Sequence, residues 1–281
     1  MAMTLTIFGT RGSIPAPGPD TNRFGGNTSC VYVANDEGQV LLLDAGSGVR
    51  LAGMQIPPSV RRVDILLTHL HMDHIQGLGF FRPLYIPGLE VHIWGPPSAT
   101  STLRARLARY LSPPLFPVRI RDLPSMVQCH DVTTSSWEIG AFRIEAALVC
   151  HPDPTLGYRI TYNNRVLAYL PDHEPQLGSR PLGLPRREWL SGFSVAEGAH
   201  LLLHDAQYTD AEYAMRVGWG HCTAELAARF AEMVEARRLL FFHHDPARSD
   251  AELERVCREA AATHTGSIRM SAAAEMDNIT V

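Results

Sequence analysis

One short stretch of the sequence carries four side chains that commonly bind metal ions. Three imidazoles and one carboxylate fall within six consecutive residues, as His69, His71, Asp73 and His74. These nitrogen and oxygen ligands suit zinc and are tolerated by iron or manganese. His69 and His71 lie two residues apart in expected extended chain, so they point the same way and can share one ion. Asp73 and His74 follow the turn and can face a second ion. A polar surface turn with chance histidines is the disfavoured alternative.

Three further residues of ligand type each follow an apolar run: His151, Asp172 and His243. Any one of them alone would more often be a surface or capping residue. Together they raise the ligand set to three protein ligands for each of two ions, plus a bridging carboxylate and open positions for water. Asp44 also follows an apolar run. Its spacing fits an acceptor that orients a liganding histidine and equally fits a turn residue before Gly46.

Several neighbours of these residues leave alternatives open. His243 directly ends its apolar run and is the expected ligand, although His244 or Asp245 could contribute. Cys150 and Cys222 each adjoin a motif histidine and could be ligands or reactive thiols. A small buried apolar residue is the favoured interpretation of both cysteines.

Apolar runs and turn residues predict the elements that must position these side chains. The expected strands cover residues 4–8, 29–33, 40–44, 63–68, 91–94, 142–149, 157–161, 165–170, 199–204 and 238–242. Helical spacing predicts helices over 99–111, 223–236 and 249–262, the last opening with a capping box at Ser249 and Glu252. Residues 175–185 are expected to form a loop. No linker or repeat divides the chain, so we expect one α/β domain over residues 1–281. The site residues lie past the carboxyl ends of strands, where ligands bind in layered α/β folds.

Composition narrows the functional class. The chain has a net charge of −4, a pI near 6.3 and 45% hydrophobic residues. This is a poor match to a protein that grips long nucleic acid through a basic face, so long nucleic acid is not an expected partner. The five cysteines form no CxxC pair, which favours a reducing compartment. No signal peptide or membrane-length apolar run is found, and we expect a cytoplasmic protein without a membrane partner.

One local group of positive charges departs from this acidic average. Five arginines surround the predicted helix over 99–111, namely Arg104, Arg106, Arg109, Arg119 and Arg121. They could meet an anionic partner, although a solvated helix face is the favoured interpretation. Arg11 or Arg23, beside glycine-rich loops, could likewise contact an anion, although solvated arginines are the favoured interpretation.

The ordered set of motifs resembles the metallo-β-lactamase superfamily over nearly the whole chain. Within that superfamily the likeness is greatest to tRNase Z and the related cyclic phosphodiesterases, carried by residues 8–10, 27–29, 151–158, 204–208 and 220–223. The resemblance implies a four-layer αββα sandwich, a phosphodiester substrate and a homodimer. It assigns His69, His71 and His151 to one metal. It assigns Asp73, His74 and His243 to the other, with Asp172 bridging. Asp205 stands where tRNase Z has Glu, and Cys222 stands where it has Ser.

A further histidine could act as the proton donor that the metal ions do not supply. Metal ions generate an attacking hydroxide, but a departing alkoxide also needs a proton donor. His221, held by Asp205, is a suitable acid pair because the pKa of imidazole lies near neutrality. A neighbour of a helix N-cap is the alternative for His221. We therefore expect catalytic roles for Asp73, His221 and Asp205.

The leading hypothesis is a phosphodiesterase that acts on a small or cyclic, nucleotide-like phosphodiester. Its cofactors would be two divalent ions, zinc first and manganese or iron as alternatives. A tRNase Z-like endoribonuclease is disfavoured because only about residues 161–169 separate the third and fourth motifs, which leaves no room for the arm that holds tRNA in that family. A hydrolase of lactones or thioesters is a second class, and it needs no acid pair. A diiron redox or sensing protein is a third class.

Overall fold

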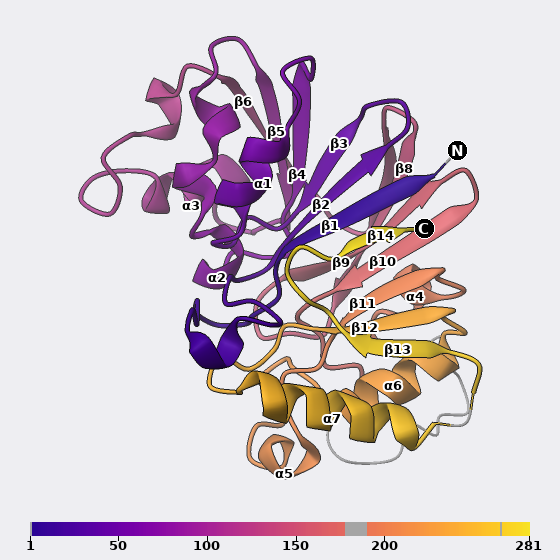
Figure 1. The fold of residues 1–281 in the computed structure, drawn as a ribbon. Coiled ribbons are helices and arrows are strands. Elements are labelled where there is room, and N and C mark those ends of the chain that lie inside the picture. Colours follow the sequence, from indigo (N-terminus) through magenta and orange to yellow (C-terminus); the bar gives the residue numbers. More distant parts are fainter. Residues whose placement is uncertain (1, 178–189, 265) are drawn as a thin grey trace.

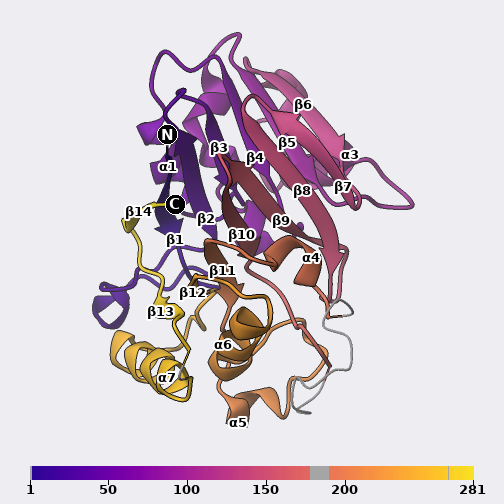
Figure 2. The same ribbon diagram turned by 90° about the vertical axis from the view of Figure 1, so that its right-hand side faces the viewer.

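The computed structural model describes residues 2–177, 190–264 and 266–281. In these residues two seven-stranded sheets pack face to face, with helices on the outer face of each sheet (Figures 1 and 2). The predicted α/β class and αββα layering are therefore confirmed. The first sheet has the order β14-β1-β2-β3-β4-β5-β6 and the second β13-β12-β11-β10-β9-β8-β7.

The strands of the first sheet are β1 (Met3–Gly9), β2 (Cys30–Asn35), β3 (Val40–Leu43), β4 (Arg62–Leu66), β5 (Glu90–Gly95), β6 (Met126–Asp131) and β14 (Asn278–Thr280). Those of the second are β7 (Ser135–Ile139), β8 (Phe142–Val149), β9 (Thr155–Tyr162), β10 (Arg165–Leu170), β11 (Leu201–Asp205), β12 (Arg238–Phe242) and β13 (Arg269–Ala272). The α-helices are α1 (Val49–Gln55), α2 (Met72–Ile75), α3 (Leu103–Tyr110), α4 (Phe193–Ala196), α5 (Asp210–Tyr213), α6 (Ala224–Met233) and α7 (Asp250–Ala262). Short 3-10 helices are η1 (Pro19–Thr21), η2 (Leu78–Phe80), η3 (Arg82–Tyr85) and η4 (Ile120–Asp122).

Each sheet joins an antiparallel part to a parallel part. β1, β2 and β3 pair antiparallel, whereas β3 to β6 pair parallel. In the second sheet β7 to β10 pair antiparallel and β10 to β13 pair parallel. Parallel strands bring their carboxyl ends to one edge of a sheet, and that edge carries the candidate site in both halves.

Apolar side chains fill the space between the sheets and the space under the helices. Leu5, Val33, Phe142 and Phe242 belong to the layer between the sheets. β11 is buried along its whole length, because the first sheet covers one of its faces and α6 contributes to the cover of the other. Such strands contain continuous apolar runs, as Leu201–Leu203 does within the strand expected over residues 199–204.

Both predicted hairpins are present. β2 and β3 pair antiparallel across residues 36–39, and β9 and β10 pair across Asn163 and Asn164. These two asparagines have φ of 48° and 61°, as a two-residue type I′ turn requires. The capping box of α7 is also present, because Ser249 and Glu252 each accept from the other's backbone N–H.

Other predictions differ from the structure in extent. The helix expected over 99–111 begins only at Leu103, because the Thr102 side chain caps it by accepting from the Ala105 N–H. The elements that were not predicted are β6, β7, β13, β14, α1, α2, α4 and α5. Most of the loop expected over 175–185 lies outside the described residues. Among the described residues no helix is long and apolar enough to cross a membrane.

Candidate active site

The first sheet supplies a continuous set of site residues. β4 ends at Leu66, His69 is wholly buried, and α2 turns the chain so that Asp73 and His74 point inward. Asp44, at the end of β3, accepts from the Thr68 N–H at 2.7 Å and lies 2.8 Å from His74 Nδ1. Asp44 has a φ of 59°, a conformation that is costly for a residue other than glycine. Its hydrogen bonds hold the turn that presents the histidines.

The second sheet supplies single residues from separate strands. His151 follows β8, Asp172 follows β10, and His243 follows β12. The parallel pairing of β10, β11 and β12 brings Asp172 and His243 to the same edge. His243 has a φ of 56°, and its ring fills the space that a Cβ on Gly12 would occupy. Gly12 therefore serves a close approach to the site.

In each histidine of the set, the nitrogen that faces away from the centre has a polar partner. His69 Nδ1 lies 3.1 Å from Thr68 Oγ1, and His243 Nδ1 lies 3.1 Å from Gln207 Oε1. His151 Nδ1 lies 3.0 Å from the Gly220 carbonyl oxygen. Only His71 uses Nε2 in this way, at 3.0 Å from Asp153 Oδ2. Such outer partners fix the tautomer and orientation of histidines that bind metals.

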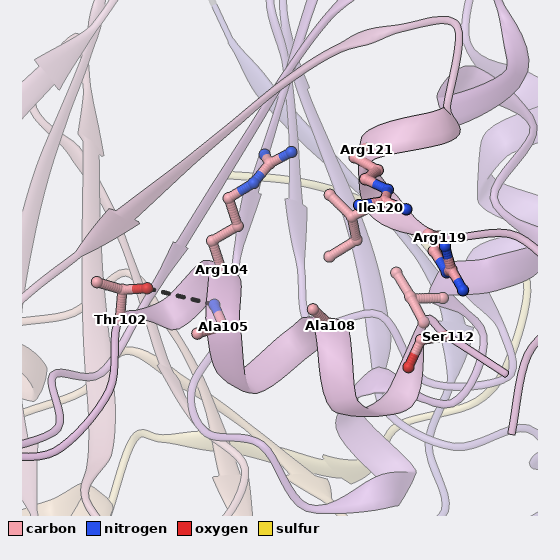
Figure 3. Close-up of a pocket in the computed structure, with 9 residues that line it drawn as sticks. Thr102, Arg104, Ala105, Ala108, Ser112, Arg119, Ile120 and Arg121 are labelled. Atoms are coloured by element: carbon pink, nitrogen blue, oxygen red, sulfur yellow. Dashed lines mark hydrogen bonds between the residues drawn. The ribbon is translucent and has the colours of Figure 1, made fainter. Parts of the chain in front are cut away.

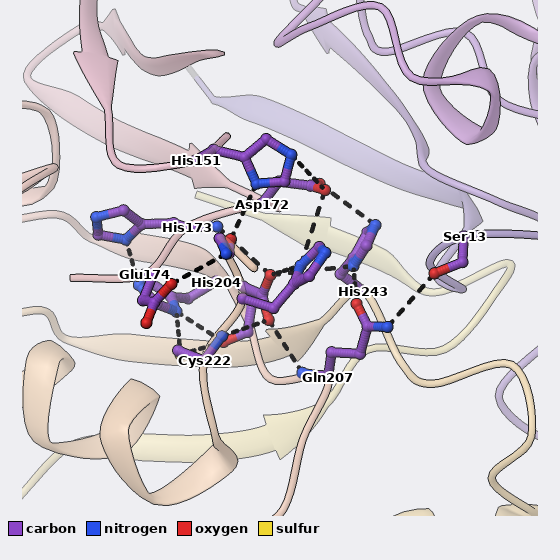
Figure 4. Close-up of polar contacts among 12 residues, drawn as sticks. Ser13, His151, Asp172, His173, Glu174, His204, Gln207, Cys222 and His243 are labelled. Carbon is purple, nitrogen blue, oxygen red and sulfur yellow. Dashed lines mark hydrogen bonds and ion pairs between the residues drawn. The ribbon is translucent and has the colours of Figure 1, made fainter. Parts of the chain in front are cut away.

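The inward atoms converge around Asp172, which Figure 4 shows together with His151 and His243. Asp172 Oδ1 lies 3.0 Å from His74 Nε2 and 3.3 Å from His243 Nε2, and Asp172 Oδ2 lies 3.7 Å from His69 Nε2. Ligand atoms lie within 4.8 Å of one another in two groups that match the expected sets, His69 with His71 and His151, and Asp73 with His74 and His243. The structure thus brings together all seven residues that the sequence singled out as ligands.

Three of these inward atoms, His69 Nε2, His74 Nε2 and Asp172 Oδ1, are buried without a hydrogen bond, although His74 Nε2 and Asp172 Oδ1 face each other at 3.0 Å. Buried polar atoms are rarely left unsatisfied, because desolvation without a compensating bond is costly. A divalent cation at the centre would satisfy all three at once. The donor set of imidazoles and carboxylates therefore fits a metal centre.

The pKa shifts of these side chains also favour a metal centre. Burial lowers the pKa of His69 and His151, which favours the neutral imidazoles that bind metals. Burial opposes the charged forms of His74 and Asp172 as well. The carboxylates of Asp172 and Asp73 nevertheless raise the pKa of His74, and the histidines hold the pKa of Asp172 well below its usual range. The buried carboxylates of Asp73 and Asp172 thus make the centre attractive to positive charge.

His221 and Asp205 form a pair at the rim of this centre. His221 Nδ1 lies 2.7 Å from Asp205 Oδ2, and the His221 ring stacks on that of His243 with ring centres 5.0 Å apart. Asp205 also accepts from the backbone N–H groups of Gln207 and Cys222. Although burial disfavours the charged imidazole, Asp205 raises the pKa of His221 to about 9. The pair has the geometry of an oriented proton donor.

The sequence left His244, Asp245 and Cys222 as alternative ligands, and the structure gives their side chains other partners. His244 is buried against Phe24, and its Nε2 lies 3.0 Å from the Ala273 carbonyl oxygen. The Asp245 side chain accepts from the Ala247 N–H. Cys222 Sγ lies 3.1 Å from the Asp205 carbonyl oxygen, and burial raises the pKa of its thiol well above the usual value. His243 is thus the inward residue of its segment, and Cys222 is a buried packing residue.

Arg11 is not a solvated side chain, and the anion that it contacts is the Asp250 carboxylate of the same chain, at 3.4 Å. Arg11 is fully buried and donates to the carbonyl oxygens of Gly25, Asp245 and Arg248. Its guanidinium joins three loops beneath the site, which the sequence did not indicate.

Several supporting residues were also not predicted. Asp153 and Gln207 hold His71 and His243, and Tyr169 donates to Asp44 at 3.0 Å. The short spacing of Asp153 after His151 was the one available signal. Glu174, two residues after Asp172, is fully buried and belongs to the network below the site.

The arginines around α3 line a separate hollow of about 420 Å³ (Figure 3). Arg104, Arg119 and Arg121 are exposed around a floor that includes Ala108 and Ile120. Arg106 turns away and pairs with Asp131 at 3.1 Å. Part of the patch is therefore a concave basic surface, not an evenly solvated helix face.

Known proteins share this fold and sequence pattern. A family model described as the beta-lactamase superfamily domain matches residues 39–244. Ribonuclease Z of Gemmatimonas aurantiaca is 28% identical over 249 residues, which cover 74% of this chain and 77% of that protein. A diphosphatase of the PhnP family has a TM-score of 0.68 at 20% identity, covering 100% of this chain and 98% of that one. The short form of human tRNase Z has a TM-score of 0.65 at 22% identity, covering 98% of both chains.

Proposed function

The chain belongs to the beta-lactamase superfamily, and from that premise we propose that it is a metal-dependent phosphodiesterase. The observation that carries the proposal is the His221–Asp205 pair beside the ligand cluster, since His221 Nδ1 lies 3.9 Å from Asp172 Oδ2. A cleaved phosphodiester releases an alkoxide, which leaves readily only when it is protonated. The ribonuclease Z relatives, which cleave phosphodiester bonds, support the same chemistry.

The proposed ligands are those that the sequence named. His69, His71 and His151 would hold one ion, Asp73, His74 and His243 the other, and Asp172 would bridge them. Two bound divalent ions lower the pKa of water and neutralise charge on the phosphoryl oxygens. We infer zinc, because histidine-rich sites of this kind suit it. A homodimer and a cytoplasmic location remain expectations from sequence.

The chain's own residues would act on the leaving oxygen and on orientation. Asp205 binds His221 Nδ1, so Nε2 is the ring nitrogen that would give its proton to the leaving oxygen. Asp44, Thr68, Gln207 and Gly220 keep the ligand histidines in one orientation. Preorganised groups of this kind need little rearrangement during the reaction.

A compact diester, including a cyclic or nucleotide-like one, is the proposed substrate. The two-residue turn between β9 and β10 supports it, because no arm extends from the chain there to hold a large RNA. The net charge of −4 also gives little general attraction for a polyanion.

A ribonuclease Z-like activity on longer RNA is the second candidate. The arginine-lined hollow beside α3 favours it, because exposed guanidinium groups bind phosphates. The ribonuclease Z relatives also weigh against a substrate range limited to small molecules. Hydrolysis of lactones or thioesters has less support, since it does not need the His221–Asp205 acid pair.

One panel of substrates separates these functions. Zinc-loaded protein would be assayed on bis-p-nitrophenyl phosphate, 2′,3′- and 3′,5′-cyclic nucleotides, a precursor tRNA and a lactone. The proposal expects cleavage of the small diesters to exceed that of the other two. Site-specific trimming of precursor tRNA, lost in Arg119→Glu while the small diesters are still cleaved, would establish the second candidate instead. Dominant lactone hydrolysis would exclude both.

A further inference from the structure

Glu174 is a buried carboxylate that the proposed chemistry does not use. It follows Asp172 by two residues, is fully buried, and lies in the network of Figure 4 beneath the ligand cluster. Its backbone N–H donates to the Cys150 carbonyl oxygen at 3.1 Å, so its position is tied to the residue that precedes His151. A buried carboxylate is costly unless several donors satisfy it.

Three neutral donors do so, and two belong to one turn. The backbone N–H groups of Gly218 and Gly220 each lie 3.0 Å from Glu174 carboxylate oxygens, and the Tyr213 hydroxyl donates to the same carboxylate. Gly218 and Gly220 have φ of 88° and 82°, which only glycine adopts readily. Charge-assisted bonds to two amides of one turn hold it in a single conformation.

The same turn touches His151 directly. The Gly220 carbonyl oxygen lies 3.0 Å from His151 Nδ1. A Cβ on Gly220 would lie 2.1 Å from that same nitrogen, so the turn fits closely against the imidazole. When Nδ1 donates to this carbonyl, Nε2 is left to face His71 and Asp172. The position of the Gly220 carbonyl thus decides the tautomer and direction of the His151 ring.

We propose that Glu174 is a positioning residue for the metal centre, holding the 218–220 turn so that Gly220 orients His151 as a ligand. The inference rests on the proposed metal-dependent function and adds to it a residue that touches neither metal nor substrate. His221 directly follows the same turn, so a displaced turn also moves the proposed proton donor.

Zinc affinity tests this proposal without any substrate. Glu174→Gln keeps the volume but places an amide NH₂ where the turn needs an acceptor. Competition with a chromophoric chelator should show zinc binding weakened by about 10–100-fold, the usual effect of losing an outer partner of a metal ligand. Asp64→Asn is the matched control, because Asp64 is also a buried acid. Its carboxylate accepts hydrogen bonds from Arg62 and Trp94, which belong to the first sheet and not to the 218–220 turn. The control should keep native zinc affinity even where it lowers thermal stability.

Gly218→Ala provides a second variant if Glu174→Gln does not fold. Gly218 is exposed and a Cβ there would meet no atom within 4 Å, so only the turn's backbone conformation is strained. It should weaken zinc binding in the same direction by a smaller factor. Native zinc affinity in a folded Glu174→Gln or Gly218→Ala protein would overturn the proposal. Because zinc affinity is measured without substrate, a protein that binds zinc normally but cleaves no phosphodiester would instead refute the proposed function.

Discussion

The two sheets contribute to the candidate site in different ways. The first sheet places four ligand-type side chains on one turn after β4, between His69 and His74. The second sheet supplies one residue after each of β8, β10 and β12, and Asp205 at the end of β11. The first set depends on local chain geometry, whereas the second depends on the order and register of a whole sheet. Their meeting point is Asp172, which lies within 4.0 Å of histidines from both sets.

The largest expected effect comes from removing that meeting point. Asp172→Ala should lose at least one metal ion per chain and lower phosphodiesterase turnover by about 10³-fold or more, since a metal contributes several kcal/mol to the transition state. Metal analysis after gel filtration and steady-state kinetics would measure both. If the first-sheet turn alone held the metals, Asp172→Ala would keep full metal content, and the two-sheet account would be wrong.

His221→Ala tests the proposed proton donor, which Asp205 at the end of β11 holds and which binds no metal in this account. Metal content should remain, and turnover should fall by about 10²–10⁴-fold on a diester with a ribose leaving group. On bis-p-nitrophenyl phosphate the loss should be far smaller, because p-nitrophenolate departs without a proton. Asp205→Asn should act in the same direction but more weakly. Equal losses on both substrates would assign His221 to binding or structure, and loss of metal would make it a ligand.

Asp44→Asn tests whether Asp44 holds the ligand turn of the first sheet in place. Asp44 bonds His74, Thr68 and Tyr169, so the change should disorder the turn and weaken zinc binding by about 10–100-fold. Chelator competition would measure it, with Asp64→Asn as the buried control on the same sheet. Unchanged zinc affinity would show that the first-sheet turn holds its own geometry without Asp44.

The smallest effect should come from a residue outside both sets. Ser249→Ala removes the side-chain cap of α7 and should lower the free energy of unfolding by about 1 kcal/mol. Zinc affinity and turnover should stay at native values. A loss of turnover would mean that α7, whose Asp250 contacts Arg11, transmits its position to the site.

The same contrast explains what could be predicted from sequence. The ligand turn was recognisable because its four ligand-type residues fall within six consecutive positions. The ends of β10 and β12 were recognisable because buried strands are continuous apolar runs. The hairpin at Asn163 and Asn164 carried its own turn signal. These local patterns, with the family resemblance, were enough for the layering and the expected ligand set.

The residues that support the site were less accessible to prediction. Gln207, Tyr169 and Glu174 act through contacts between segments that are distant in sequence, and nothing in their local pattern distinguishes them. β6 and β7 were missed because half-buried edge strands lack a clear apolar run. Arg11 shows the same limit, since its buried guanidinium bonds residues more than 230 positions away in the chain.

Anomalous X-ray diffraction at the zinc edge on crystals of zinc-loaded protein tests the central claim most directly. The account predicts two peaks roughly 3.5–4 Å apart, as in two-metal hydrolytic sites. One should lie among His69, His71 and His151, the other among Asp73, His74 and His243, with Asp172 between them. A single peak, or ligand side chains that turn away from the peaks, would contradict it.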